Sequence, residues 1–240
     1  AELERVYEQH GPAAVFGGSY GWASAGRVHH AQSQIHRFLN VLGGSVRSVN
    51  TYSAGAAEVI LPRVLASYTE LVGDTVAWPD VVEHGRLVVA FGGMPERTRY
   101  VHSGGPSRHR AGPALRDARA AGVEFALVSP LRDDLAAELG ASWLAPRPLT
   151  DVALMLGLAH TLVVEGLHDQ AFLERWTSGY PVFERYLLGL DDGQPKDTAW
   201  AASICGLDED DIRDLARRMA AGPTLISVAH GLQRAEHGEQ

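Results

Sequence analysis

Three histidines lie close together near the start of the chain, and side chains of this type can bind a metal ion. His29 and His30 are adjacent, and His36 follows on the same predicted helix. Adjacent helical residues point about 100° apart, so His29 and His30 are poorly placed to share one ion. His29 and His36 are separated by roughly two helical turns, which is too far for a common ion. The spacing therefore favours polar or packed histidines over a zinc site.

Short motifs that would reveal a common enzyme class are missing. The chain has no GxGxxG after a predicted strand, no GxxxxGK[ST], no HExxH and no CxxC. Ser24 and Ser53 could be combined with histidines and aspartates into a hydrolase triad, but no segment resembles the GxSxG motif. The GGSYGW segment lacks the spacing of a nucleotide-binding loop, and we interpret it as a glycine turn. Spacing alone leaves the reaction open, and a non-catalytic α/β binding domain stays an alternative.

The composition argues against several functional classes. A formal net charge of -8 is unlike a nucleic-acid surface, which needs a basic patch. Cys205 is the one cysteine, so the chain can form neither an internal disulfide nor an iron–sulfur cluster. No uncharged apolar run reaches the roughly 18 residues of a membrane span. We expect the chain to be an internal fragment of a cytoplasmic protein. The periplasm is the alternative location, because the true N-terminus, where an export signal would lie, is expected to be missing.

Apolar segments that alternate with helical patterns predict an α/β fold. Predicted strands cover residues 86–93, 123–129, 142–145 and 224–229, with a further short strand at 14–18. Strands that are apolar on both faces indicate a Rossmann-like parallel sheet flanked by helices. Ligands of such sheets bind beyond the carboxyl ends of the strands. Helices are predicted at residues 2–9, 27–42, 55–66, 113–121, 133–139, 151–165, 169–176, 181–188, 198–204 and 209–220. The acidic run 208–211 is interpreted as the N-terminus of the last of these helices.

One long stretch carries a family resemblance. The segment FGGSYGWASAGRVHHAQSQIHRFLNVLGG, followed by SVNTYSAGAAEVILPRVL, resembles the metal region of the dimethyl sulfoxide reductase family of molybdopterin oxidoreductases. The likeness is greatest to its biotin sulfoxide reductase members. It continues through LVVAFGG, SPLRDD, PRPLTDVALMLGLAHTL and HGLQRAEHGEQ, so it covers nearly the whole chain. It implies a helical segment with the metal-site motifs at residues 1–80 and a Rossmann-like domain that binds the dinucleotide cofactor at residues 81–240.

The resemblance implies molybdenum held by bis(molybdopterin guanine dinucleotide), with Ser53 as the protein ligand. An alkoxide is a hard donor that suits a high-valent metal. The alternative for Ser53 is an ordinary N-cap of the helix that begins near Gly55. Tyr20 and Trp22 match family residues whose O–H and N–H groups donate hydrogen bonds at the oxo face of the metal.

Further residues are implied to bind the cofactor. Asp151, behind Thr150, would accept guanine N–H groups, although either residue could instead cap the following helix. Arg234 would pair with anionic groups. The full set of implied cofactor-binding residues is Gly92, Gly93, Ser129, Pro130, Arg132, Thr150, Asp151, His230, Gly231, Gln233, Arg234 and His237.

The implied reaction is reduction of a small S-oxide or N-oxide by oxygen-atom transfer, with electrons from an unidentified donor. Formate dehydrogenases and nitrate reductases are the alternative within the same class, but they place Cys, selenocysteine or Asp where Ser53 stands. We expect the 240-residue chain by itself to be apo and inactive, because family enzymes are much longer.

Overall fold

The computed structural model of the chain describes residues 1–19, 28–51, 53–73, 76–102, 105–106 and 108–239. These residues form two compact units. One unit contains residues 1–55 and 96–111, and the other contains residues 56–95 and 112–240. The predicted division into a helical segment at residues 1–80 and a cofactor-binding domain at residues 81–240 rests on the family resemblance and stays a prediction.

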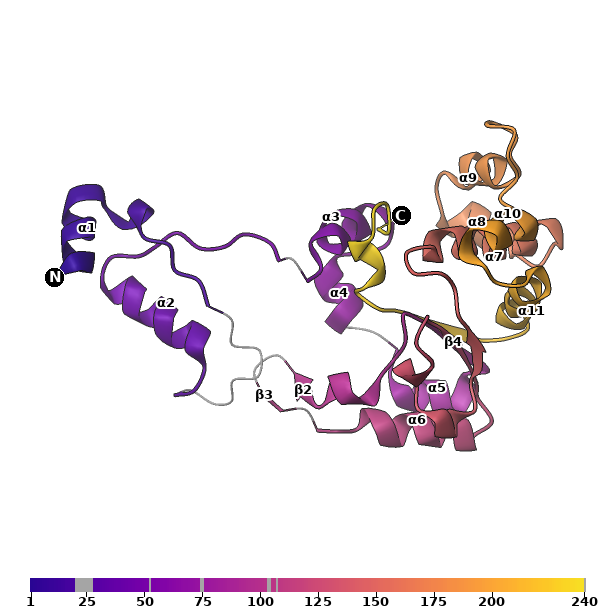
Figure 1. Cartoon of the computed structure of the whole chain (residues 1–240), viewed down its shortest axis with the longest axis horizontal. Coiled ribbons are helices and arrows are strands. Elements are labelled where there is room, and N and C mark those ends of the chain that lie inside the picture. Colours follow the sequence, from indigo (N-terminus) through magenta and orange to yellow (C-terminus); the bar gives the residue numbers. More distant parts are fainter. Residues whose placement is uncertain (20–27, 52, 74–75, 103–104, 107, 240) are drawn as a thin grey trace. The chain divides into compact units, whose positions relative to one another are not determined.

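A parallel sheet organises the larger unit (Figure 1). Its strands are β1 (Leu87–Phe91), β4 (Glu124–Val128), β5 (Ser142–Leu144) and β6 (Thr224–Val228), in the spatial order β5-β4-β1-β6. All three strand pairings are parallel. The chain adds β4 and β5 on one side of β1 and then places β6 on the other side. This is the order of the first four strands of a doubly wound fold, so the predicted α/β class is confirmed.

Helices cover both faces of this sheet. Leu87, Val89 and Phe91 pack in one apolar cluster with α7 (Asp151–Val164), α10 (Thr198–Cys205) and α11 (Glu209–Ala220). Val88 and Ala90 point to the other face and pack with α5 (Trp78–His84) and α6 (Ala111–Ala120). Because neighbouring strand residues face opposite sides, a strand that is apolar throughout needs a cover on each side.

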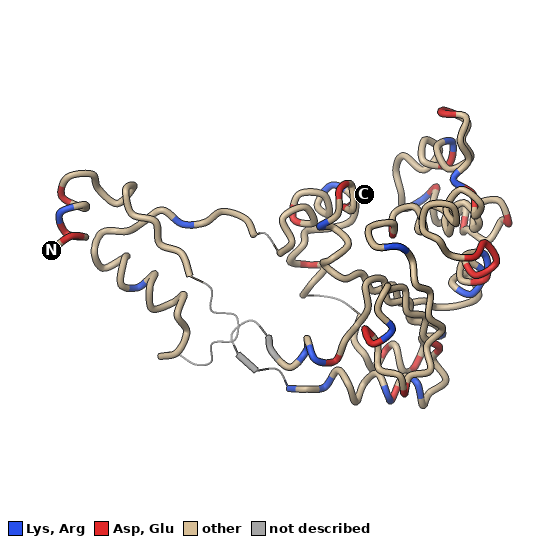
Figure 2. The backbone as a smooth tube through the Cα atoms, viewed as in Figure 1, with Lys and Arg blue, Asp and Glu red and all other residues tan. Residues whose placement is uncertain are grey.

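The helix α11 begins as its acidic run predicts. Asp208 is the N-cap residue, and its carboxylate accepts a hydrogen bond from the Asp210 N–H at 2.9 Å. Acidic residues occupy the first turn, and Arg217 and Arg218 occupy the last turn (Figure 2). Both placements complement the helix dipole.

Most predicted helices are confirmed within one or two residues, but some elements differ. The predicted helix at 133–139 is wrong: two 3-10 turns, η3 (Arg132–Asp134) and η4 (Ala137–Leu139), flank an extended Leu135. The predicted strand at 14–18 is reduced to a single bridge between Phe16 and Val46. The short helices α4 (Tyr68–Gly73) and α5 were not predicted. Helices α8 (Gln170–Trp176) and α9 (Tyr180–Leu187) were predicted.

The smaller unit has little regular structure besides α1 (Glu2–His10) and α2 (Ala31–Val41). The hydroxyl group of Tyr7 donates to the carbonyl of Gly44 and ties α1 to the turn after α2. His30 is the N-cap of α2, and its ring nitrogen Nδ1 accepts from the Ser33 N–H at 3.2 Å. The unit also contains the 3-10 turns η1 (Pro12–Ala14) and η2 (Glu96–Arg99), and a hairpin of β2 (Val101–His102) and β3 (Gly105–Pro106).

The helix α3 (Gly55–Val64) contains Pro62 in its interior. Among the described residues, no helix has both the length and the apolar character needed to cross a membrane.

Gly157 allows close packing of α7 against α10 and α11. A Cβ atom at this position would lie 2.6 Å from Cβ of Ala201 and 3.6 Å from Cγ2 of Ile212. We expect Gly157→Ala to lower the free energy of unfolding by about 1–3 kcal/mol, because overpacking outweighs the better helix propensity of alanine. The matched control is Gly73→Ala, where none of the described residues has an atom within 4 Å of the added group. Urea unfolding followed by circular dichroism measures both variants, and equal stability of the two would contradict the packing argument.

Candidate cofactor site

The carboxyl ends of β1 and β6 meet where the strand order reverses. Gly92 follows β1 with a φ angle of 76°, a backbone conformation that favours glycine. A Cβ atom on Gly92 would lie 2.7 Å from Cβ of Ala229 and 2.8 Å from Cδ1 of Leu232. The Ala229 N–H donates to the Phe91 carbonyl at 2.8 Å. Gly92 therefore lets the chain after β6 pass directly over the end of β1, at the place where doubly wound folds bind ligands.

Gly93 and Ser129 hold the loop that follows β4. Gly93 has a φ angle of 82°, and a Cβ atom there would collide with Asp134. Ser129 is only 2% exposed, and its hydroxyl donates to Oδ2 of Asp134 at 2.8 Å and accepts from the Leu131 N–H at 3.2 Å. The N–H groups of Gly92 and Gly93 both donate to backbone carbonyls. In this structure these residues have packing roles, and their predicted contacts with the cofactor stay predictions.

Pro130 and Arg132 lie on the exposed side of the same loop. The guanidinium carbon of Arg132 lies 5.6 Å from the ring centroid of Trp143, within the range of a cation–π interaction. Nε1 of Trp143 donates to the Ser129 carbonyl at 2.8 Å. Trp143 thus contacts both Arg132 and the residue that follows β4, and the guanidinium group of Arg132 stays at the surface.

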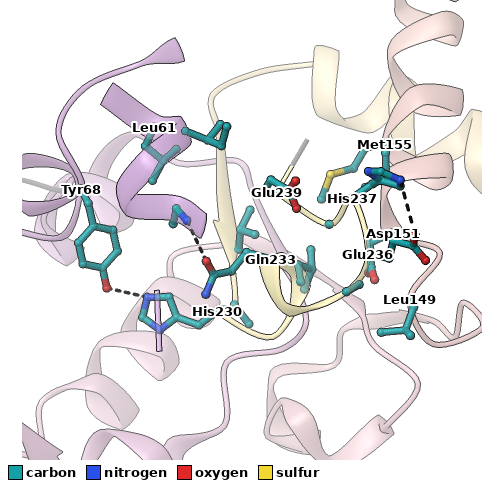
Figure 3. Close-up of a pocket in the computed structure, with 18 of the residues that line it drawn as sticks. Leu61, Tyr68, Leu149, Asp151, Met155, His230, Gln233, Glu236, His237 and Glu239 are labelled. Atoms are coloured by element: carbon teal, nitrogen blue, oxygen red, sulfur yellow. Dashed lines mark hydrogen bonds and ion pairs between the residues drawn. The ribbon is translucent and has the colours of Figure 1, made fainter. Parts of the chain in front are cut away.

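A cavity of about 500 Å³ lies beside the end of β6 (Figure 3). Its walls come from α3, α4, the start of α7 and the segment that follows β6. Four of the predicted cofactor-binding residues line it, and between them lie apolar side chains such as Leu61 and Met155. This volume and mixture of groups are typical of sites for small organic ligands. The four predicted residues are Asp151, His230, Gln233 and His237.

Asp151 supplies a partly buried carboxyl group to this cavity. Burial raises its pKa above the ordinary range, and a hydrogen bond from its own backbone N–H only partly offsets this. The N-cap position of α7 belongs to Thr150, whose hydroxyl donates to the Arg147 carbonyl at 2.7 Å rather than capping the helix. Of the two cap candidates, Thr150 holds the position, and Asp151 lies in the first turn.

The segment after β6 contributes His230 and Gln233. The hydroxyl of Tyr68, on α4, lies 2.9 Å from Nε2 of His230. The Ala57 N–H donates to Oε1 of Gln233 at 2.9 Å, so this glutamine satisfies a backbone group in the first turn of α3. Figure 3 shows the Tyr68–His230 pair at one side of the cavity and Asp151 and His237 at the other.

The rest of this segment is a tight turn. Gly231 precedes the 3-10 turn η5 (Leu232–Arg234), and the Arg234 side chain is exposed. Nε2 of His237 lies 3.9 Å from Oε1 of Glu236. The segment thus places several polar groups close to the end of β6.

Backbone strain is concentrated near the predicted site residues. Four described non-glycine residues have a positive φ angle, and these are Asn50, His109, Leu149 and His237. Leu149 directly precedes Thr150, and His237 lines the cavity. A left-handed conformation is costly for a residue with a side chain, and such strain is concentrated at functional sites.

Ser53 belongs to the smaller unit and lies in a turn. Asn50 has a φ angle of 69°, and its side-chain Oδ1 accepts from the Thr51 N–H at 2.6 Å. The half-buried Ser53 follows, and its N–H donates to Oγ1 of Thr51 at 3.2 Å. Since α3 begins at Gly55, Ser53 stands one residue before the N-cap position, which weakens the capping alternative. Tyr20 and Trp22 lie outside the described residues.

Sequence reasoning missed Tyr68 and the strained Leu149. The signal for Tyr68 was the Ser67-x-x-Glu70 pattern, a capping box that predicts a helix start. In the structure the Ser67 N–H donates to Oε2 of Glu70 at 3.0 Å, and the Glu70 N–H donates to Oγ of Ser67 at 3.2 Å. No local pattern marks Leu149 as a left-handed residue.

Comparison with known proteins decides the family. The family model described as molybdopterin oxidoreductase matches residues 1–240. The chain belongs to the molybdopterin oxidoreductase family. The predicted resemblance is therefore confirmed at the level of the family.

Several curated relatives of this molybdopterin oxidoreductase chain are named as oxide reductases. It is 44% identical to a dimethyl sulfoxide/trimethylamine N-oxide reductase and to a biotin sulfoxide reductase, both of Cereibacter sphaeroides. It is 38% identical to a trimethylamine-N-oxide reductase of Haemophilus influenzae. Each match covers 100% of this chain but only 29%, 32% and 29% of the three relatives, respectively. The chain thus spans about a third of their length.

A solved structure supports the fold. The acetylene hydratase of Pelobacter acetylenicus aligns with a TM-score of 0.58 over 99% of this chain and 29% of that protein. At 19% identity, this likeness concerns the fold and not the reaction.

The strain at Leu149 can be released by glycine. We expect Leu149→Gly to be more stable than Leu149→Ala by about 1 kcal/mol, because alanine retains the penalty of a left-handed side chain. Leu149 is 71% exposed, so both substitutions remove little buried surface. Thermal unfolding measures the difference, and equal melting temperatures would show that the left-handed conformation carries no strain.

Because the pKa of Asp151 is raised in the folded state, we expect its contribution to the stability of the fold to fall as the pH rises. The folded state binds this proton more tightly than the unfolded state, in which the pKa of aspartate is about 3.9. The stabilisation is fully present below that pH and is lost as the pH rises through the raised pKa. Asp151→Asn, which cannot ionise, should therefore gain stability over the wild type as the pH rises. Urea midpoints from pH 4 to pH 8 test this, and a difference that stays constant with pH would contradict it.

Proposed function

We propose that the parent protein is a molybdenum-dependent reductase of S-oxides or N-oxides, and that this chain forms part of its cofactor site. The observation that carries the proposal is the cavity beside the end of β6, which gathers Asp151, His230, Gln233 and His237. The family membership and the printed activities of the relatives support the same conclusion.

The cavity fits one part of a guanine dinucleotide cofactor. Apolar walls suit a flat ring, and a carboxylate is the group that accepts paired N–H donors such as those of guanine. Asp151 lies at the cavity, and burial strengthens the hydrogen bonds that its carboxylate accepts. We therefore propose the bis(molybdopterin guanine dinucleotide) form of the cofactor. Arg234, with its exposed guanidinium group, is proposed to pair with an anionic group of this cofactor.

The strand-end residues are proposed to act mainly by shaping the edge of the site. Gly92, Gly93 and Ser129 shape the edge against which a ligand would lie. Pro130, Arg132, Thr150 and Gly231 complete the proposed contact set, and among them only Arg132 adds a charge.

Bound molybdenum with its dithiolene ligands supplies oxygen-atom transfer by a two-electron change. The chain's own residues position the reactants. Ser53 is proposed to supply a hard oxygen ligand from its turn. Tyr20 and Trp22 are proposed to donate hydrogen bonds from O–H and N–H groups and so orient the oxide oxygen.

The partners of the parent follow from this activity. The substrate is proposed to be a small S-oxide or N-oxide, and a separate redox partner must deliver two electrons in each turnover. We propose a cytoplasmic location, and fractionation of cells that express the parent, with a periplasmic marker enzyme as reference, tests it.

The metal content of the full-length parent tests the proposed function. We expect the wild type to contain molybdenum and guanine nucleotide in a ratio of one to two, and to reduce an S-oxide or N-oxide with a reduced viologen dye. Ser53→Ala should lose at least about 100-fold of this activity, because the metal loses a protein ligand. The control is Ser203→Ala, an exposed serine whose hydroxyl donates only to the Trp200 carbonyl in the same helix.

The result can go against the proposal in two ways. A wild-type parent without molybdenum would exclude the enzyme, and full activity of Ser53→Ala would exclude Ser53 as the ligand. The isolated 240-residue chain serves as a further comparison, and we expect it to retain no molybdenum and to be inactive.

A further inference from the structure

Tyr68 is held in place by its own helix start. It is the first residue of α4 and lies within the capping box that Ser67 and Glu70 form. The hydroxyl of Ser67 also donates to Oε2 of Glu70 at 2.6 Å. These bonds fix the first turn of α4, and with it the direction in which the Tyr68 ring leaves the backbone.

The ring of Tyr68 reaches His230, 162 residues further along the chain. The Tyr68 hydroxyl lies 2.9 Å from Nε2 of His230, and the two ring centroids are 5.9 Å apart. Both residues line the cavity at the end of β6 (Figure 3). The contact therefore joins α4 to the segment that carries several of the proposed cofactor-binding residues.

The direction of this hydrogen bond follows from the chemistry of the phenol. Burial, with a further contribution from Glu58, raises the pKa of Tyr68, so the hydroxyl keeps its proton. Within the described part of the chain, His230 Nε2 is the one acceptor that this O–H reaches. Since the neutral phenol has a proton to donate and Nε2 lies within its reach, we assign the O–H as the donor and Nε2 as the acceptor. A neutral imidazole that accepts at Nε2 carries its proton on Nδ1.

We propose that Tyr68 is a positioning residue that fixes the tautomer of His230, so that its Nδ1–H group donates to an acceptor oxygen of the cofactor in the cavity. This inference rests on the proposed function, because it takes the cofactor as the ligand. It assigns a role to a residue of α4 that lies outside the motifs from which the family was predicted.

Cofactor retention in the full-length parent tests the role of Tyr68. Tyr68→Phe removes the hydroxyl and keeps the ring. We expect it to release guanine nucleotide roughly fivefold faster than the wild type, the effect of losing one net hydrogen bond. Tyr180→Phe is the matched control, because it also loses a phenol hydrogen bond, to Glu184, but does not contact His230.

A second substitution separates positioning from simple packing. In His230→Asn the side-chain amide can place an N–H near the position of Nδ1 but no longer extends to Tyr68. We expect this variant to retain the cofactor better than His230→Leu and to be insensitive to an added Tyr68→Phe. If Tyr68→Phe speeds release equally in the wild-type and His230→Asn backgrounds, Tyr68 does not act through His230 and the inference is wrong.

The tautomer itself can be measured without the cofactor. In the apo parent labelled with 15N-histidine, the ring nitrogen shifts assigned to His230 should show the Nδ1–H form in the wild type and a mixture in Tyr68→Phe. The same shifts in both proteins would overturn the inference. A parent that never binds the cofactor would refute the proposed function, and these spectra would still decide whether Tyr68 sets the tautomer.

Discussion

The burial of β1 on both faces is the constraint on which the larger unit depends. None of its five residues, Leu87–Phe91, is more than 2% exposed. Such a strand is stable only if neighbouring strands satisfy its backbone groups and helices cover both of its faces. The chain meets this demand with parallel strands and intervening helices, and parallel strands all end at the same edge of the sheet. The position of the cavity is therefore a consequence of the way the core is buried.

Residues at the edge where the strands end fall into two groups: some hold neighbouring segments in place, and others are proposed to bind a ligand. Gly92 and Gly93 allow close passage of neighbouring segments, and Ser129 is used by hydrogen bonds within its own loop. Asp151 differs, because its carboxyl group is partly desolvated and is not used to cap its helix. Groups with a structural use shape this edge, whereas the Asp151 carboxyl group is proposed to bind a ligand.

The sequence predicted the elements whose patterns are long or strongly apolar. The strands β1 and β4 and the helix α7 are of this kind, because periodicity over many residues is a strong signal. The 3-10 turns at 132–139 were taken for a helix, since the extended Leu135 between them leaves no local mark. Residues such as Asp151 and His230 came from the family resemblance, and periodicity alone would not have distinguished them. Tyr68 escaped both approaches, because its partner lies far away in the sequence and the two meet only in the fold.

The complete burial of Cys205 has a practical consequence. This side chain is fully enclosed in the cluster of α7, α10 and α11 against the sheet, and it is the chain's single thiol. A thiol reagent can reach it only when this helical layer separates from β1 or the chain unfolds. The chain therefore carries a natural single-site reporter: the rate at which Cys205 is labelled measures how often the core beneath the cavity opens.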